Sequence, residues 1–254
     1  MQYSTFAAID IGSYDVILEI FEISKKQGIR SVDKICHRME LGKDTYTLGK
    51  IRPEMEEELC RVLADFVRIM EGYRVDAYRA MASSAISEAA NSLYVLGKIR
   101  QLTGLSVTVL SNSEQRFLGY KALAAMEDNF NKVIEKGTAI LDLDGGSFQI
   151  SLFDKDALVT TQNIRMGSLR VRERLAGIQS ETEHYEEMVE ELIWNEVSSF
   201  KKMYLKDRKI ENIMLIGDVF TDSVYQNIEE KTTKIISREN FNTWYEKIIR
   251  QSPM

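Results

Sequence analysis

The sequence predicts an α/β protein that consists of two halves with similar architecture. Predicted strands and helices alternate along the chain, which is typical of sheets flanked by helices. In addition, an apolar strand followed by an acid and a glycine–serine turn occurs twice, at Phe6–Ser13 and at Ala139–Ser147. A repeat of this kind within 254 residues favours two domains of related fold over one large domain.

Composition and charge limit the class of protein. Apolar residues make up 44% of the chain and charged residues 28%, which is ordinary for a soluble protein with a full core. The formal net charge of -6 argues against a general nucleic-acid binder, because such proteins need a basic domain. The N-terminus has no signal-peptide pattern, no apolar run is long enough to span a membrane, and Cys36 and Cys60 lack metal-ligand spacing. We therefore expect a cytoplasmic protein with no nucleic-acid or membrane partner.

The first half begins with a predicted antiparallel meander and a helix. Short apolar runs between Phe6 and Leu41 are separated by a turn at Lys25–Gly28, which is typical of neighbouring antiparallel strands. Pro53 stands at a favourable first-turn position, and acids follow it where helix N-termini prefer negative charge. The apolar residues that then recur at helical spacing are Leu59, Val62, Leu63, Phe66, Ile69 and Met70.

The rest of the first half alternates between strands and helices. The predicted elements are a strand at Val75–Ala82, a helix or two short helices at Ala85–Leu102, a strand at Val107–Leu110, and a helix capped by Asn112 or Ser113. The ambiguity in the first helix arises at Asn91-Ser92, because Asn and Ser favour caps and turns over helix interiors. Because helical crossovers connect parallel strands, this order adds parallel strands to the sheet.

The second half repeats this pattern. The predicted elements are strands at Thr138–Leu143, Gln149–Phe153 and Leu158–Asn163, a long helix at about Glu181–Met203, a strand at Ile213–Ile216 and a helix at Arg238–Arg250. The long helix is acidic at its start and lysine-rich at its end, which suits the helix dipole. No low-complexity linker separates the halves, so we place the boundary near residues 124–135 and predict domains of residues 1–126 and 127–254.

The two glycine turns predict a phosphate-handling protein. Gly12-Ser13 and Gly145-Gly146-Ser147 follow strands that end in acids, and glycine lets backbone N–H groups approach an anion closely. Two such turns in related halves would face one shared anion.

Four arginines form the densest basic group of the chain. They are Arg165, Arg170, Arg172 and Arg174. The group is either a solvated helix face or an anion-facing patch, and the sequence leaves both interpretations open.

Five motifs occur in an order that is typical of one family. They are Asp10-Ile-Gly-Ser13, Met81–Ile86 with Asn91, Val109–Arg116, Leu141–Ser147 and Arg165-Met-Gly-Ser168. With these motifs the chain resembles the Ppx/GppA family, which comprises exopolyphosphatases and guanosine pentaphosphate phosphohydrolases of the actin-like ATPase superfamily. The resemblance implies two ribonuclease-H-like domains with mixed sheets flanked by helices, and a cleft between them that binds phosphates and Mg²⁺.

The resemblance also implies roles for individual residues. The family's water-orienting glutamate opens a helix, and in Ser113-Glu-Gln-Arg116 it aligns with Glu114, within one residue; the alternative is a helix-capping acid. Asp10 and Asp142 would hold Mg²⁺, although an Asp at the end of a strand is as often a turn former. Gly217 would belong to a third phosphate-binding turn. The expected substrates are polyphosphate or guanosine pentaphosphate.

The chain departs from the family pattern at positions that carry chemistry. Ile17 and Ser87 stand where the family has arginines, Asp144 stands at a glycine position, and Gln149 stands at an acid position. In the third turn, Ile216–Thr221, only the first glycine and the final threonine match.

Two hypotheses therefore stay open. The first is a Mg²⁺-dependent phosphoanhydride hydrolase, in which the arginines from Arg165 to Arg174 replace the missing cations. The second is a catalytically impaired relative that acts as an anion-sensing or interaction module. The resemblance implies a further strand–helix segment in the second domain, so either the sequence is truncated or this domain has lost an edge. A lost edge would leave an exposed strand, which a second copy of the chain could cover as a homodimer.

Overall fold

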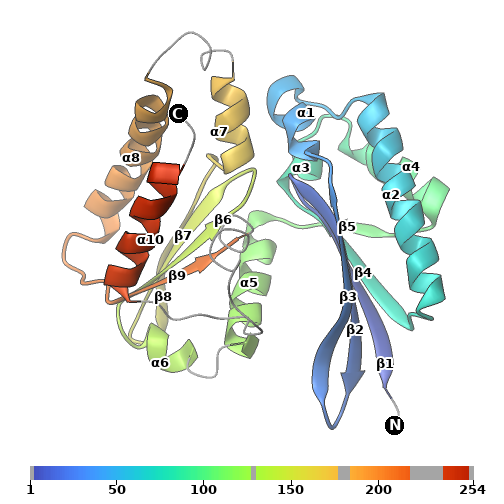
Figure 1. The fold of residues 1–254 in the computed structure, drawn as a ribbon, viewed down its shortest axis with the longest axis horizontal. Coiled ribbons are helices and arrows are strands. Elements are labelled where there is room, and N and C mark those ends of the chain that lie inside the picture. The colour runs from blue at the N-terminus through green and yellow to red at the C-terminus, as the bar shows by residue number, and fades with distance from the viewer. Residues whose placement is uncertain (1–2, 127–129, 177–183, 218–236, 252–254) are drawn as a thin grey trace.

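The computed structural model describes residues 3–126, 130–176, 184–217 and 237–251. These residues form two lobes that lie side by side, each built on one sheet with helices packed against it (Figure 1). The first sheet has five strands in the order β3-β2-β1-β4-β5, and the described part of the second has four in the order β8-β7-β6-β9. Both sheets mix parallel and antiparallel pairs, which confirms the predicted fold class.

Apart from one additional helix, α1, the first lobe follows the predicted order of elements. It comprises β1 (Ser4–Ile11), β2 (Asp15–Ser24), β3 (Gly28–Arg38), α1 (Leu41–Leu48), α2 (Pro53–Gly72), β4 (Ala77–Ala82), α3 (Ser84–Ser87), α4 (Ser92–Thr103) and β5 (Val107–Val109). Strands β1 to β3 form the antiparallel meander, and β4 and β5 add in parallel. The segment at 84–103 forms two helices, because the Asn91 side chain accepts a hydrogen bond from Ile51 N and donates one to Ile51 O.

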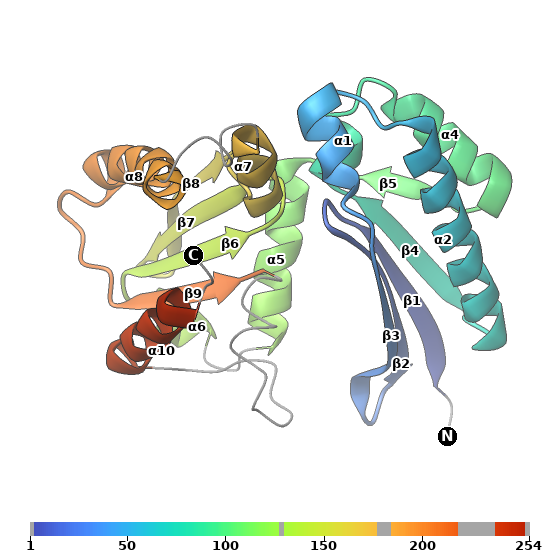
Figure 2. The same ribbon diagram turned by 45° about the horizontal axis from the view of Figure 1, so that its top comes forward.

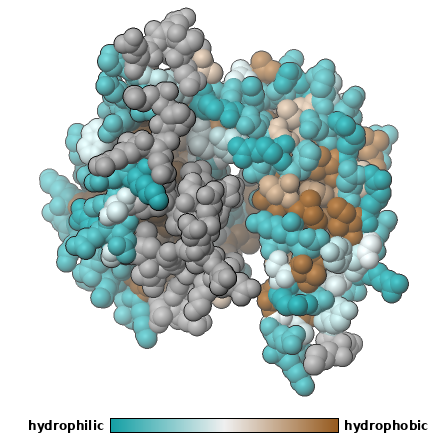
Figure 3. Space-filling view, in the orientation of Figure 1, coloured by the Kyte–Doolittle hydropathy of each residue, from teal (hydrophilic) through white to brown (hydrophobic). Residues whose placement is uncertain are grey.

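Side chains along β2 alternate between the two faces of the first sheet, and the core of the first lobe lies on one of these faces. Val16, Leu18 and Ile20 on β2 are buried on one face of the sheet, as expected for a strand with period two. They share one core cluster with residues of α2 such as Leu63 and Phe66. Helices α2 and α4 run alongside each other over this face (Figure 2). On the side of the molecule shown in Figure 3, hydrophobic residues form a patch on this lobe.

The second lobe has helices on both faces of its sheet. Its elements are α5 (Asn112–Met126), α6 (Phe130–Ile134), β6 (Thr138–Leu143), β7 (Phe148–Asp154), β8 (Ala157–Ile164), α7 (Ser168–Leu175), α8 (Tyr185–Tyr204), β9 (Asn212–Ile216) and α10 (Arg238–Gln251). Phe200 of α8 packs on one face with Ile150 and Leu152 of β7. Phe153 at the end of the same strand packs on the other face with α5 and α6. β7 is therefore almost wholly buried.

Helix α5 connects the lobes. It follows β5 of the first sheet, yet Tyr120 on α5 packs edge-on against Phe153 with ring centroids 5.2 Å apart and donates a 2.6 Å hydrogen bond to Ser151 Oγ. Its side chains thus pack on the second sheet, whereas the division at residue 126 groups it with the first half; that division stays a prediction.

Three helices were not predicted from the sequence: α1, α6 and α7. Helix α1 contains one glycine and two threonines, which are weak helix formers, so its pattern gives no local helix signal. Contacts with distant residues hold it instead: Thr45 Oγ1 donates to Ala85 O at 2.6 Å, and Gly42 N donates to Ser13 O at 2.9 Å. None of the described helices combines the length and apolar character that crossing a membrane requires.

Candidate functional site

The two glycine turns meet at the junction between the lobes. The first follows β1 and the second connects β6 to β7. A Cβ atom placed on Gly145 would lie 2.8 Å from the Tyr14 ring and 3.1 Å from Ser13 Cβ, so the turns are in direct contact. The sequence repeat had predicted this juxtaposition. The phosphate-binding role of the glycines stays a prediction.

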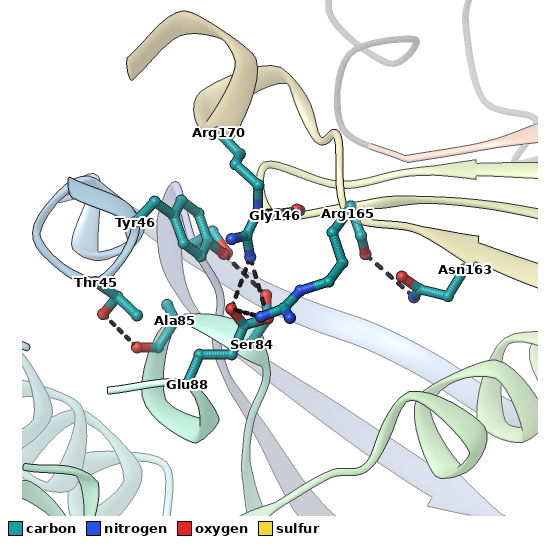
Figure 4. Close-up of polar contacts among 11 residues, drawn as sticks. Thr45, Tyr46, Ser84, Ala85, Glu88, Gly146, Asn163, Arg165 and Arg170 are labelled. Atoms are coloured by element: carbon teal, nitrogen blue, oxygen red, sulfur yellow. Dashed lines mark hydrogen bonds and ion pairs between the residues drawn. The ribbon is translucent and has the colours of Figure 1, made fainter. Parts of the chain in front are cut away.

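Tyr46 of α1 fills the space beside both turns. Its hydroxyl lies 2.6 Å from Ser13 Oγ and 2.9 Å from Ser84 Oγ (Figure 4). A Cβ on Gly146 would overlap the Tyr46 hydroxyl and Ser84 Oγ, so only glycine fits at this position. Burial raises the pKa of Tyr46, which keeps its phenol neutral. In this arrangement the protein's own hydroxyl groups cover the glycine face of the second turn.

The first turn is closed on itself. Gly12 N donates a 3.0 Å hydrogen bond to Asp15 O, and Ser13 is buried. Tyr14 O accepts from Met39 N and Glu40 N, which ties the start of α1 to the turn. Asp10, predicted to hold Mg²⁺, is an exposed residue near the end of β1, paired in register with Met81 of β4; its metal role stays a prediction.

Arginines of the second lobe reach across the junction to the first. Arg170 Nη2 lies 3.0 and 2.9 Å from the two carboxylate oxygens of Glu88, and Arg165 pairs with the same carboxylate (Figure 4). Arg170 also donates from Nε to Gly146 O at 2.8 Å, and its guanidinium stacks 3.9 Å from the centre of the Tyr46 ring. Both side chains pair with an acid of the other lobe, a contact that the sequence did not indicate, and Arg165 is still largely exposed.

A second bridge joins Arg172 to Glu40. The guanidinium meets the carboxylate as a fork, with Nη1–Oε1 at 3.0 Å and Nη2–Oε2 at 2.6 Å. This hydrogen bonding lowers the pKa of Glu40 and raises that of Arg172. We call the contacts of Arg165 and Arg170 with Glu88, and of Arg172 with Glu40, the interlobe ion pairs. Arg174, the fourth arginine of the run, is exposed.

A small polar pocket lies on the other side of the second turn, at the start of α5. It is lined by Asn112, Gln115, Arg116, Asp142, Asp144, Ser147, Gln149 and Asn163. Gln115 Nε2 donates to Asp144 Oδ2 at 2.7 Å, and Asn163 Nδ2 donates to Ser147 Oγ at 3.3 Å. The polar pocket thus combines two carboxylates with amides, a hydroxyl and one arginine.

Glu114 does not line the polar pocket. Its Oε2 accepts hydrogen bonds from Ser111 N at 2.9 Å and Ser111 Oγ at 2.7 Å, and its own N–H faces Ser111 Oγ. This is a capping box, and the Ser111 N–H lowers the pKa of Glu114. The α5 residue that faces Asp144 is its neighbour Gln115, whose side chain is an amide. The water-orienting role of Glu114 stays a prediction.

The polar pocket offers the oxygen ligands that Mg²⁺ prefers. Asp142 and Asp144 supply carboxylates, and Ser147 supplies a hydroxyl oxygen. Within the described ranges no group of three or more His, Cys, Asp or Glu side chains could hold a metal ion. A cation held here would therefore have at most two carboxylate ligands from the described residues, those of Asp142 and Asp144.

Gly217 has a structural reason to be glycine. Its φ of 121° lies in the region that side chains rarely adopt, and a Cβ there would overlap Leu143 O on β6. The other residues of the proposed third turn, 218–221, lie outside the described residues. The phosphate-binding role of Gly217 stays a prediction.

Sequence reasoning missed Tyr46, Glu88, Glu40 and Gln115 as members of this junction. Glu88 lies 82 residues from Arg170, and Glu40 lies 132 residues from Arg172. A local signal exists only for the capping role of Glu114: the pattern Ser111-x-x-Glu114 places the cap at Ser111, not at the predicted Asn112 or Ser113.

Comparisons with a family model, with curated proteins and with solved structures all find Ppx/GppA proteins or exopolyphosphatases. The model of the Ppx/GppA phosphatase family matches residues 19–253. A bifunctional 3-dehydroquinate synthase/phosphatase of Fusobacterium nucleatum is 21% identical over 238 residues, which cover 89% of this chain and 34% of that protein. Exopolyphosphatase 1 of Mycobacterium leprae is 25% identical over 144 residues, covering 56% of this chain and 41% of the relative. The chain thus spans about a third to two-fifths of the length of these relatives.

Solved structures show the same fold. A Ppx/GppA family member from Aquifex aeolicus superposes with a TM-score of 0.73 at 21% identity, covering 98% of this chain and 80% of that one. An exopolyphosphatase from Cytophaga hutchinsonii gives a TM-score of 0.74 at 18% identity, with 97% and 80% covered. The likeness extends to the ethanolamine utilization protein EutJ of Carboxydothermus hydrogenoformans, with a TM-score of 0.50 at 15% identity over 85% of this chain and 77% of that one. The predicted actin-like ATPase fold is confirmed.

Proposed function

This chain belongs to the Ppx/GppA phosphatase family, and we propose that it hydrolyses the terminal phosphoanhydride bond of inorganic polyphosphate. The observation that carries the proposal is the polar pocket between the second glycine turn and the start of α5. Phosphoryl transfer depends mainly on positioning and on neutralising charge, and this pocket brings carboxylates, amides and an arginine to one place. The exopolyphosphatase relatives support the same class of substrate.

The residues of the pocket divide this work. Arg116 and the Ser147 hydroxyl would bind oxygens of the terminal phosphate, and the amides of Gln115 and Asn163 would position neighbouring groups. Asp142 and Asp144 would hold Mg²⁺, which when bound supplies positive charge to the phosphate oxygens. A water molecule attacks the terminal phosphorus, and the bridging P–O bond breaks. The products are orthophosphate and a polyphosphate chain shortened by one phosphate. Because the transition state is loose, orienting the water matters more than removing its proton early.

Glu114 is the proposed water-orienting carboxylate of the family alignment. To reach the water it has to leave Ser111 N and Oγ, which it binds at 2.9 and 2.7 Å. The hydrolase proposal therefore requires that these two hydrogen bonds break, which costs free energy. It also makes Glu114 the most informative residue to substitute.

A second candidate is a module that binds a phosphate chain without hydrolysing it. The observation that favours it is the amide at the pocket-facing position of α5: Gln115 cannot accept a proton as a carboxylate does. Tyr14 and Tyr46 also cover the glycines of the second turn. Under this proposal the same residues bind the anion, and turnover is absent.

Phosphate release separates the two candidates. The measurement uses long-chain polyphosphate and, separately, guanosine pentaphosphate with Mg²⁺, and compares the natural chain with Asp142→Asn and Glu114→Gln. The hydrolase proposal expects saturable release that falls about 100-fold in Asp142→Asn, because a group that neutralises transition-state charge is lost. Asp156→Asn, at the β7–β8 turn of the same lobe, is the control and should keep the natural rate.

The pattern of rates decides between the candidates. Background release by the natural chain and by Asp142→Asn, with both substrates, contradicts the hydrolase and favours the binding module. Full activity in Glu114→Gln would instead limit Glu114 to its capping role while leaving the hydrolase in place.

A further inference from the structure

Two arginines of the second lobe hold one carboxylate of the first. The Glu88 carboxylate accepts from Arg170 Nη2 at 3.0 and 2.9 Å and also from Arg165. A guanidinium group that binds a carboxylate through several N–H groups presents the same donors to a phosphate. Glu88 is therefore an internal anion that occupies an arginine site at the junction (Figure 4).

Arg170 would stay in place without Glu88. Its Nε donates to Gly146 O at 2.8 Å, and its guanidinium stacks on the ring of Tyr46 at 3.9 Å. Its side chain is only 19% exposed, so packing as well as pairing fixes its position. Preorganised donors of this kind lose little side-chain entropy when a ligand binds.

The arginine site adjoins the second glycine turn. Gly146, whose carbonyl oxygen Arg170 binds, is the neighbour of Ser147, and Ser147 lines the polar pocket. A phosphate chain with its end in the polar pocket would have to pass around the second turn to reach Arg170, because the pocket and Tyr46 lie on opposite sides of this turn. Arg165 is 65% exposed, so a ligand can reach the site from solvent.

We propose that Arg165 and Arg170 form a binding subsite for a phosphate group of a linear polyphosphate, and that Glu88 occupies this subsite until the ligand displaces it. The proposal rests on the proposed function only for the choice of ligand. Displacement removes two of the interlobe ion pairs, since Glu88 belongs to the first lobe and both arginines to the second. Binding of the chain is thus coupled to loosening of the junction.

Binding of tripolyphosphate to the full chain tests the subsite. Calorimetry without Mg²⁺ measures its Kd for the natural chain and for Glu88→Gln, so that hydrolysis does not consume the ligand. Glu88→Gln removes the competing charge and should lower Kd about tenfold, which corresponds to ~1.4 kcal/mol. The matched control is Glu57→Gln, an exposed acid of the same lobe, which loses the same charge and should change Kd less than about twofold.

Two further variants keep the test decisive. Arg170→Gln in the Glu88→Gln background should abolish the gain, because the freed donor is then absent. If Glu88→Gln fails to fold, Glu88→Asp, which keeps the charge but shortens the side chain, should give a smaller gain in the same direction.

The proposal is overturned if Glu88→Gln binds tripolyphosphate no better than Glu57→Gln. This result is independent of turnover. Glu88→Gln can bind tripolyphosphate more tightly whether or not the natural chain releases phosphate, and an active natural chain does not guarantee tighter binding by the variant. Failure of the subsite and failure of the proposed function are therefore distinguishable.

Discussion

The first and second glycine turns share a sequence pattern but differ in their surroundings. In the first, Ser13 is buried beneath Tyr46, and Gly12 closes a tight turn onto Asp15 O. The second turn touches Tyr14 and Tyr46 on one side, while Asp144 and Ser147 face the polar pocket on the other. The repeated pattern places both turns at the junction, and their neighbours decide which one offers groups to a ligand.

The difference arises from the residues that make up each turn and its flank. A tyrosine comes directly after Gly12-Ser13, whereas the second turn has consecutive glycines that accept this ring and the Tyr46 hydroxyl. The second turn thus packs against the first, in which Ser13 is buried. The resemblance to phosphate-binding turns is therefore more informative for the second turn than for the first.

The largest expected effect comes from adding a methyl group to the second turn. In Gly146→Ala the new Cβ would overlap the Tyr46 hydroxyl and Ser84 Oγ, so the lobes have to separate or Tyr46 has to move. We expect the free energy of unfolding to fall by about 2–3 kcal/mol in chemical denaturation. Gly12→Ala, where the new Cβ would lie 3.0 Å from Asp15 O, should lose less.

A matched control is Gly97→Ala in α4, which has open space at its Cβ position and should gain stability by about 0.5–1 kcal/mol. Equal losses at positions 12 and 146 would contradict the difference between the turns.

A smaller effect is expected when the hydroxyl between the turns is removed. Tyr46→Phe leaves Ser13 Oγ and Ser84 Oγ without the group they share at 2.6 and 2.9 Å. Loss of these partly buried hydrogen bonds should lower the free energy of unfolding by about 1–2 kcal/mol. Tyr94→Phe, on the exposed side of α4, serves as the control, and a loss of the same size there would show that the hydroxyl at the turns is not special.

The smallest effect concerns pH. Arg172 lowers the pKa of Glu40 below its ordinary value of 4.5, so the folded state favours the ionised carboxylate. The stability from this pair is complete above pH 4.5 and is lost as the pH falls through the lowered pKa. The natural chain should therefore lose about 0.5–1 kcal/mol more than Glu40→Gln between neutral and acidic pH, since solvent screens this partly exposed pair. Unfolding curves of both proteins at several pH values test this, and parallel losses would refute it.

Local patterns predicted most of the fold. The meander of β1 to β3, the helix α2 that begins at Pro53, and the strands of the second sheet follow from periodicity and turn residues. The pattern leaves open whether residues 85–102 form one helix or two, because the choice depends on Asn91, the N-cap of α4, whose side chain binds Ile51, 40 residues away. Helices α1 and α7 also lack a local signal: α1 is held by Ala85 and Ser13 of its own lobe, and α7 pairs with acids of the first lobe.

The sequence predicted that the two glycine turns lie together, but it did not predict the side-chain contacts around them. Both glycine turns meet as the repeat indicated, and Asp142 lies in the polar pocket. The pairing of Arg170 with Glu88 and the contact of Gln115 with Asp144 depend on how two folded sheets face each other. No spacing within the chain encodes those contacts.

The single crossing of the described chain from the first sheet to the second has a consequence for synthesis. All strands of the first sheet lie between Ser4 and Val109, and the strands of the second sheet begin only at Thr138. During translation the first sheet is thus complete in sequence before its neighbour emerges from the ribosome, and N-terminal units generally fold first. The first lobe then presents Glu40 and Glu88 as a finished surface, and α7 arrives later to dock on it.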